Sequence, residues 1–174
     1  MTAPIQQFVS VRVPASSSNL GAGFDCVGIA IDKWLRLSAE IGEDGRSEVR
    51  ITRTGTLRAL DAAGIANVRD DLLYRGFEAV LNRCSGSAGF KGSIHFDADS
   101  DIPVARGLGS SAAALLAGAA VANAAFGLGL DPNVLAQICA RVERHGDNVG
   151  AAALGGAILV TPQARCLCFT QLPV

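Results

Sequence analysis

The sequence lacks an excess of charge of either sign. Its 15 Lys and Arg residues are balanced by 16 Asp and Glu residues, which leaves a formal net charge of -1. Proteins that bind nucleic acids or anionic membranes through electrostatic attraction usually carry a basic surplus. We therefore expect neither a nucleic acid nor a membrane as a partner.

Long hydrophobic segments are also missing. The apolar run from Ala112 to Ala122 is too short and too rich in alanine to cross a bilayer. The first residues, MTAPIQQFVSVRVP, do not show the charged region followed by an apolar stretch that marks a secretory signal. We expect a cytoplasmic protein.

Paired cysteine motifs are missing as well. The five cysteines are scattered without C-x-x-C spacing, at Cys26, Cys84, Cys139, Cys166 and Cys168. Such a set fits a reducing compartment better than a disulfide scaffold. The CLC segment could ligate a metal, but alternate positions on a strand are the favoured interpretation, because no second His/Cys cluster lies nearby in the sequence.

The sequence does contain enough apolar material for one domain with a core. A chain of this length, 49% hydrophobic, can bury about two-thirds of its unfolded surface. No internal repeat is visible, and no linker rich in Pro or Gly divides the chain. One domain is therefore the simplest prediction.

Hydrophobic periodicity predicts a mixture of strands and helices. Strands are expected over 6–14, 24–42, 47–55, 89–99 and 154–162, and helices over 70–84, 112–126 and 132–142. Asp70 and Asp71 favour the start of the first helix, and Asp131 with Pro132 the start of the third. Because strands and helices do not alternate regularly as in a doubly wound sheet, the predicted fold class is α+β.

The segment PVARGLGSSAAALLAGAAVANAAF, residues 103–126, joins a turn to an apolar helix. The 15 residues after Ser111 carry no charge and include nine alanines. Glycines let backbone N–H groups approach a ligand, and a helix start presents unpaired N–H groups at the positive end of its dipole. The hydroxyls of Ser110 and Ser111 can bond phosphate oxygens or Mg²⁺. The pattern predicts an anion-binding loop, held rigid by a helix buried on all sides.

The same residues have a second interpretation, because glycine and serine are also ordinary turn and N-cap residues. The loop lacks the lysine of the Walker pattern and the spacing of the dinucleotide-binding G-x-G-x-x-G. Its interpretation therefore depends on two further segments. These are VPASSSNLGAGFDCVGIAID, with Asn19 and Asp25, and VERHGDNVGAAALGG, with Glu143, His145, Asp147 and Asn148.

Together and in this order, the three segments resemble the GHMP kinases, the family named after galactokinase, homoserine kinase, mevalonate kinase and phosphomevalonate kinase. PVARGLGSSAA is similar to the ATP-phosphate motif that the family shares. PASSSNLGAGFD and HGDNV, followed by LGG, are similar to the corresponding segments of its homoserine kinase branch. The sugar and isoprenoid kinases of the family fit the PASSSNLGAGFD segment poorly.

The resemblance implies an ATP-dependent phosphotransferase that converts L-homoserine to O-phospho-L-homoserine in threonine biosynthesis. It implies ATP and Mg²⁺ as cofactors, a ribosomal-protein-like βαβ core, and small molecules as partners, and it is compatible with a homodimer. The residues alone make the chemistry plausible, since phosphoryl transfer depends mostly on positioning and charge neutralisation.

The resemblance also implies roles for residues at matching positions. The expected substrate-binding residues are Asn19, Asp25, His145 and Asn148, of which Asp25 and Asn148 are the expected catalytic residues. The expected metal ligands are Ser111 and Glu143. The expected ATP-binding residues are Pro103, Val104, Ala105, Arg106, Gly107, Leu108, Gly109, Ser110, Ser111, Ala112 and Ala113.

Some positions depart from the family pattern or carry an alternative interpretation. Arg141 stands where a further acid is common, so Glu143 is the nearest carboxylate for the metal, although it can also be read as a solvated helix-end charge. Gly150 stands where the family often has alanine followed by proline, at the expected start of a further helix. Arg106 either touches phosphate or faces water. His95 is expected to be an ordinary strand residue.

The chain is also short, because homoserine kinases run to roughly twice the size of a single domain. We expect residues 1–174 to be the N-terminal, ATP-binding domain, with the C-terminal domain absent from this chain, and we expect this fragment alone to be inactive. Two alternatives stay open. One is another small-molecule kinase of the family, acting on threonine or pantoate, and the other is an inactive nucleotide-binding or interaction fragment.

Overall fold

The computed structural model describes residues 6–18, 20–42, 47–64, 67–86, 90–164 and 166–173. The strands are β1 (Gln6–Ser18), β2 (Val27–Gly42), β3 (Val49–Gly55), β4 (Ser93–Ser100), β5 (Ala157–Gln163) and β6 (Cys166–Leu172). The α-helices are α1 (Arg58–Ala63), α2 (Leu72–Ser85), α3 (Ser110–Ala125), α4 (Pro132–Glu143) and α5 (Asp147–Leu154). Two short 3₁₀ helices are η1 (Gly21–Cys26) and η2 (Val68–Asp70).

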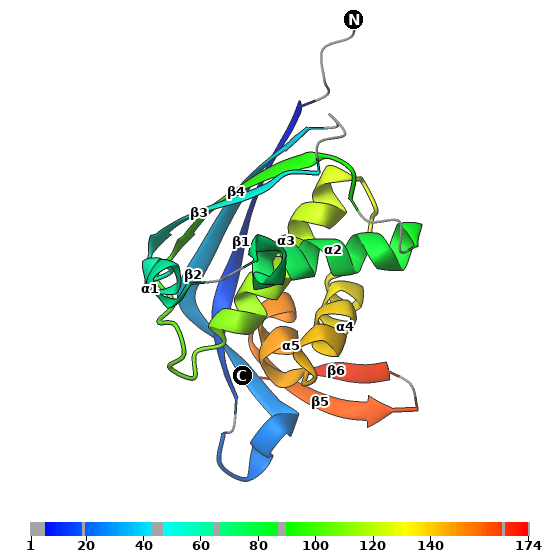
Figure 1. Ribbon diagram of the computed structural model, residues 1–174. Helices are drawn as coiled ribbons and strands as arrows, with labels where there is room; N and C mark the ends of the chain where they lie inside the picture. Colours follow the sequence, from blue (N-terminus) through cyan, green and yellow to red (C-terminus); the bar gives the residue numbers. More distant parts are fainter. Residues whose placement is uncertain are drawn as a thin grey trace, which may run out of the picture.

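The strands form one sheet, and the longer helices gather on one side of it (Figure 1). The strand order is β3-β4-β2-β5-β6, and β1 pairs with β2 along its other edge. β2 serves two neighbours because it is long: residues 27–29 pair with β5, and residues 35–42 pair with β4. β3 and β4 are parallel, with α2 in the crossover between them, whereas the other described pairs are antiparallel. The predicted α+β class is confirmed, and the crossover forms a βαβ unit.

The core lies between the sheet and the helices, with α3 at its centre. In β4 the apolar residues Ile94, Phe96 and Ala98 alternate with more exposed positions, so they face the helices. In α3 every residue from Ala112 to Ala119 is buried, as the absence of charge predicts. The buried helix gives the loop before it a rigid base.

Two glycines allow α2 and α3 to cross at close range. A Cβ atom at Gly76 would overlap the backbone oxygen of Leu115, and one at Gly118 would overlap the backbone oxygen of Leu73. Glycine inside a helix costs about 1 kcal/mol relative to alanine. Here the close approach of the two backbones requires it.

The predicted starts of α2 and α4 are confirmed. The Asp71 carboxylate accepts from the Leu73 N–H at 2.8 Å, and the Asp131 carboxylate accepts from the Val134 N–H at 3.0 Å. α3 begins differently, with Gly109 as its N-cap and no side-chain cap. A glycine of the loop is thus the N-cap, and neither Ser110 nor Ser111 caps the helix with its side chain.

Several elements differ from the sequence-based expectation. The strand expected over 24–42 begins at Val27, because the preceding residues form η1. The helix start expected around Gly150 is confirmed as the short α5, although its run of small residues has little periodic contrast. β6 carries the CLC segment as a strand, as expected. Across the described ranges, no helix is long and apolar enough to cross a membrane.

Candidate active site

The loop between β4 and α3 enters its helix through left-handed backbone positions. Ala105, Gly107 and Gly109 have φ values of 55°, 72° and 63°. Glycine adopts this conformation at little cost, whereas alanine at position 105 carries strain. Because α3 follows directly, the first N–H groups of the helix lack intrahelical acceptors and are available to an anion.

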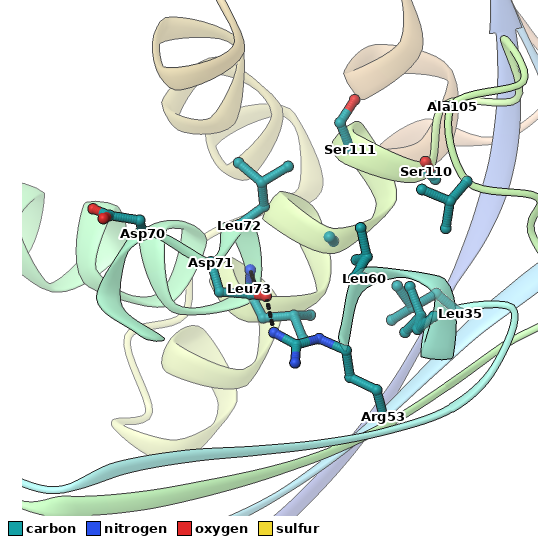
Figure 2. A pocket seen from close by; sticks show the side chains of 13 residues that line it. Leu35, Arg53, Leu60, Asp70, Asp71, Leu72, Leu73, Ala105, Ser110 and Ser111 are labelled. Carbon is teal, nitrogen blue, oxygen red and sulfur yellow. Dashed lines mark hydrogen bonds and ion pairs between the residues drawn. The ribbon is translucent and has the colours of Figure 1, made fainter. Parts of the chain in front are cut away.

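Two oxygen-bearing side chains meet beside this helix start. The Ser111 hydroxyl donates to the Glu143 carboxylate at 2.6 Å, although the residues lie 32 positions apart. Ser111 is in the first turn of α3 and Glu143 is the last residue of α4. Figure 2 shows Ser110 and Ser111 at the loop end of α3. Of the expected site residues, the two expected metal ligands therefore lie in direct contact.

Asp147 organises the start of α5. Its side chain is 2% exposed, and Oδ1 accepts from the backbone N–H of Asn148 at 2.7 Å and lies 3.1 Å from His145 Nδ1. The other ring nitrogen of His145, Nε2, lies 3.8 Å from Glu143 Oε1. The imidazole is thus held between two carboxylates, one from α5 and one from α4.

The Asn148 side chain lies between two serines of β1. The Ser16 hydroxyl donates to Asn148 Oδ1 at 3.0 Å, and Asn148 Nδ2 donates to the Ser18 hydroxyl at 2.8 Å. These bonds join the first and third sequence segments. Neither serine was singled out from the sequence, because the only local signal was their place in the SSS run before Asn19.

A cavity of about 440 Å³ brings the three segments together. Its lining comprises Ser18, Asp25, Ala105, Arg106, Gly107, Leu108, Gly109, Ser110, Ser111, His145, Asp147 and Asn148. Arg106 and Asp25 are exposed in it. Asn19 lies outside the described residues. Ala112 and Ala113 are fully buried in α3 and do not reach this cavity.

A second cavity, of about 380 Å³, adjoins the first through Ala105, Ser110 and Ser111. Most of its wall is apolar, from residues such as Leu57, Leu60, Leu72, Val104 and Ala114. Pro103 is in neither lining. This apolar chamber was not foreseen from the sequence, because its walls come from β2, β3, α1, α2 and α3.

An ion pair lies in the second cavity (Figure 2). Arg53 donates to the Asp71 carboxylate at 2.5 Å and to the Asp61 carboxylate at 2.8 Å. Burial lowers the pKa of Arg53, but the hydrogen bonds and charges of Asp71 and Asp61 outweigh it and raise the pKa overall. The guanidinium is therefore a permanent cation that links α1 to the start of α2.

The oxygen atoms of Ser111 and Glu143 suit a magnesium ion that is also bound by the phosphates of a substrate. Among the described residues, no cluster of three or more His, Cys, Asp or Glu side chains could enclose a metal. Ser111 and Glu143 instead supply two hard oxygen atoms, 2.6 Å apart. Mg²⁺ is commonly bound by one or two protein oxygens, with substrate phosphates and waters completing its octahedron. These residues fit that mode.

Comparison with known proteins gives a consistent set of relatives. The family described as GHMP kinases N terminal domain matches residues 71–156. A homoserine kinase of a Synechococcus strain is 36% identical over 151 residues, which cover 87% of this chain and 46% of that protein. The homoserine kinase of Crocosphaera subtropica is 33% identical over 165 residues, or 95% and 51% of the two chains.

A solved structure agrees with these sequences. The crystal structure of homoserine kinase from Cytophaga hutchinsonii matches with a TM-score of 0.78 at 26% identity, over 96% of this chain and 52% of that one. The chain thus spans about half the length of the curated relatives it matches. On the family match, the sequence identities and the shared fold, residues 71–156 of the chain belong to the N-terminal domain family of the GHMP kinases.

Proposed function

We propose that this protein, in a form that carries the remaining half of its relatives' length, transfers the γ-phosphoryl group of ATP to the side-chain hydroxyl of L-homoserine. The products are O-phospho-L-homoserine and ADP. The observation that carries the proposal is the single cavity in which Asp25, His145 and Asn148 face the loop of residues 105–111. Relatives named homoserine kinases, at 33% and 36% identity, support the choice of substrate.

The loop side of the cavity suits the phosphates of the nucleotide. The unpaired N–H groups at the start of α3 provide donors, and the helix dipole favours negative charge there. Ser111 and Glu143 would hold Mg²⁺, which when bound neutralises charge on the phosphate oxygens. Arg106, exposed at the rim, is free to reach phosphate oxygens.

The opposite side of the cavity suits an amino-acid alcohol. Homoserine carries an ammonium group, a carboxylate and a hydroxyl. The Asp25 carboxylate is placed to accept from the ammonium or the hydroxyl, and Asn148 offers an amide held by Ser16 and Ser18. In the transfer, the homoserine oxygen bonds to the γ-phosphorus, the bond from that phosphorus to ADP breaks, and the hydroxyl proton passes to water.

The second cavity suits the base and ribose of the nucleotide. It is largely apolar and meets the first at Ser110 and Ser111, which bound both cavities. Ligand pockets typically combine an apolar wall with a few polar groups. A nucleotide lying across Ser110 would thus place its base beside Leu57 and Leu60, and its phosphates at the helix start. The proposal also includes a location: an enzyme that uses ATP and homoserine as its substrates would act in the cytoplasm.

A coupled assay of ADP release tests the proposal. Purified protein in the longer form is supplied with MgATP and, in turn, homoserine, threonine, pantoate, mevalonate or galactose. We expect the highest kcat/KM with homoserine. Good turnover of mevalonate or galactose with none on homoserine contradicts the proposal. A Glu143→Gln variant should also need about tenfold more Mg²⁺ for half-maximal rate, whereas Glu48→Gln, just before β3 and outside both cavities, should not.

A further inference from the structure

Ser16 is a fully buried polar residue that lies behind the site without lining its cavity. Its hydroxyl donates to Asn148 Oδ1 at 3.0 Å. Its backbone N–H donates to the backbone oxygen of Leu108, in the loop, at 3.3 Å. One residue of β1 is therefore bonded both to the substrate side and to the phosphate side of the cavity.

The packing around Ser16 leaves no spare room. A Cβ atom at Gly109 would overlap the Ser16 hydroxyl and would lie 3.1 Å from Asn148 Oδ1. Gly109 also has a φ of 63°, so its backbone conformation and its missing side chain are both required. Ser16, Gly109 and Asn148 thus form one packed unit under the cavity.

The pairing of β1 with β2 is irregular next to Ser16. The pairing with β2 changes register between Pro14 and Ala15, so that Pro14 pairs with Trp34 and Ala15 pairs with Ile31. After this shift, the consecutive residues Ala15 and Ser16 are both fully buried. The shift leaves Asp32 and Lys33 of β2 without partners on β1, and such irregularities are common next to active sites.

We propose that Ser16 is a positioning residue of the phosphoryl-transfer site and acts by fixing the side chain of Asn148. Without the Ser16 hydroxyl, the Asn148 side chain keeps, among its bonds to described residues, the one to Ser18 at 2.8 Å, and its amide loses a fixed orientation toward the cavity. This inference rests on the proposed function, because it takes Asn148 as the group that meets the substrate. Ser16 itself touches neither substrate nor nucleotide.

The first test compares Ser16→Ala with Ser17→Ala in the longer form of the protein. Ser17 takes the same substitution one position along the strand, is only partly buried and lines neither cavity. In Ser16→Ala we expect the KM for homoserine to rise about tenfold and kcat to fall. The KM for ATP should stay within about twofold, because the backbone N–H that holds Leu108 is retained. Equal kinetics in the two variants, or an equal rise in both KM values, overturns the inference.

A double-mutant cycle tests whether Ser16 acts through Asn148. Radiolabelled ATP keeps slow variants measurable. In an Asn148→Ala background, Ser16→Ala should lower kcat/KM for homoserine less than about threefold further, because the group it positions is already gone. A full second loss, equal to the effect of Ser16→Ala alone, assigns Ser16 a merely structural role. A wild-type protein that does not phosphorylate homoserine instead contradicts the proposed function.

A measurement without any substrate tests the positioning role of Ser16 even if the protein does not phosphorylate homoserine. Side-chain coupling constants of Asn148 are measured by nuclear magnetic resonance on residues 1–174. We expect one χ1 rotamer in the wild type and in Ser17→Ala, and averaging over rotamers in Ser16→Ala. A single, unchanged Asn148 rotamer in Ser16→Ala overturns the positioning role, whatever the substrate is.

Discussion

The hydroxyl of Ser111 donates a 2.6 Å hydrogen bond to the carboxylate of Glu143, and so joins the first turn of α3 to the end of α4. The serine is half-buried and its hydroxyl is not used as a helix cap. Both oxygen atoms are of the type that Mg²⁺ prefers. The pair therefore links the phosphate loop to the third sequence segment at the point where a metal would be needed.

Ser111→Ala should separate activity from stability. Loss of a group that stabilises the transferring phosphoryl costs about 10² to 10³ in rate, by analogy with the loss of a single oxyanion donor. The free energy of unfolding should change by about 1 kcal/mol or less, because a cap is not lost. Steady-state kinetics and urea denaturation measure the two effects, with Ser10→Ala on the open sheet face as the control. A destabilised variant that keeps its kcat would give Ser111 a structural role only.

Arg144 ends α4 in a left-handed conformation, with a φ of 75°, and its N–H donates to the Ala140 oxygen at 2.8 Å. Glycine is the usual residue at this position of a helix end. Arg144→Gly should raise the free energy of unfolding by about 1 kcal/mol, whereas Arg141→Gly, inside the helix, should lower it by about 1 kcal/mol. Urea unfolding of both variants provides the measurement, and effects of the same sign would contradict the backbone argument.

Cys139 makes the stability depend on alkaline pH. Burial is the main cause that raises the pKa of the thiol from 9.0 to about 12, and the charge of Glu143 is the second. The native state therefore keeps a proton that the unfolded state loses above pH 9, so stability falls as the pH rises from 9 toward 12. The difference between wild type and Cys139→Ala should shrink by about 1.4 kcal/mol per pH unit in that range. Unfolding curves at pH 8 to about 11 test this, and a constant difference would contradict it.

Residues 1–174 alone should bind nucleotide weakly and show no homoserine-dependent turnover. The loop and its helix form within one contiguous stretch, but the chain spans about half the length of its relatives, and we expect the remaining half to close the 440 Å³ cavity. A site open to water screens the charges that speed phosphoryl transfer. ADP release at saturating ATP and homoserine is the measurement. Robust homoserine-dependent turnover by residues 1–174 would show that no further part of the protein is needed to complete the active site.

The features that could be predicted from the sequence are those encoded locally. Asp71 and Asp131 start their helices by capping N–H groups two or three positions away, which short-range spacing reveals. The glycine–serine loop is likewise contiguous with α3. The meeting of Asp25, His145 and Asn148 with the loop followed only from the family resemblance, since no local pattern fixes contacts across the fold.

What could not be predicted depends on tertiary packing. Ser16 is fully buried whereas Ser17 is only partly buried, and nothing in the SSS run distinguishes the two. The Arg53–Asp71 pair joins a strand to the start of a helix, 18 positions away. The length of α5 could not be predicted either, because its alanine-rich sequence carries little hydrophobic periodicity.

The identity of the phosphorylated product tests the central claim most directly. Phosphorus magnetic resonance follows the longer form of the protein with MgATP and homoserine, without coupling enzymes. The account predicts a new phosphomonoester resonance that matches O-phospho-L-homoserine and grows in step with ADP, and that is almost lost in Ser111→Ala. ADP formed with inorganic phosphate alone, with no phosphomonoester, would contradict it.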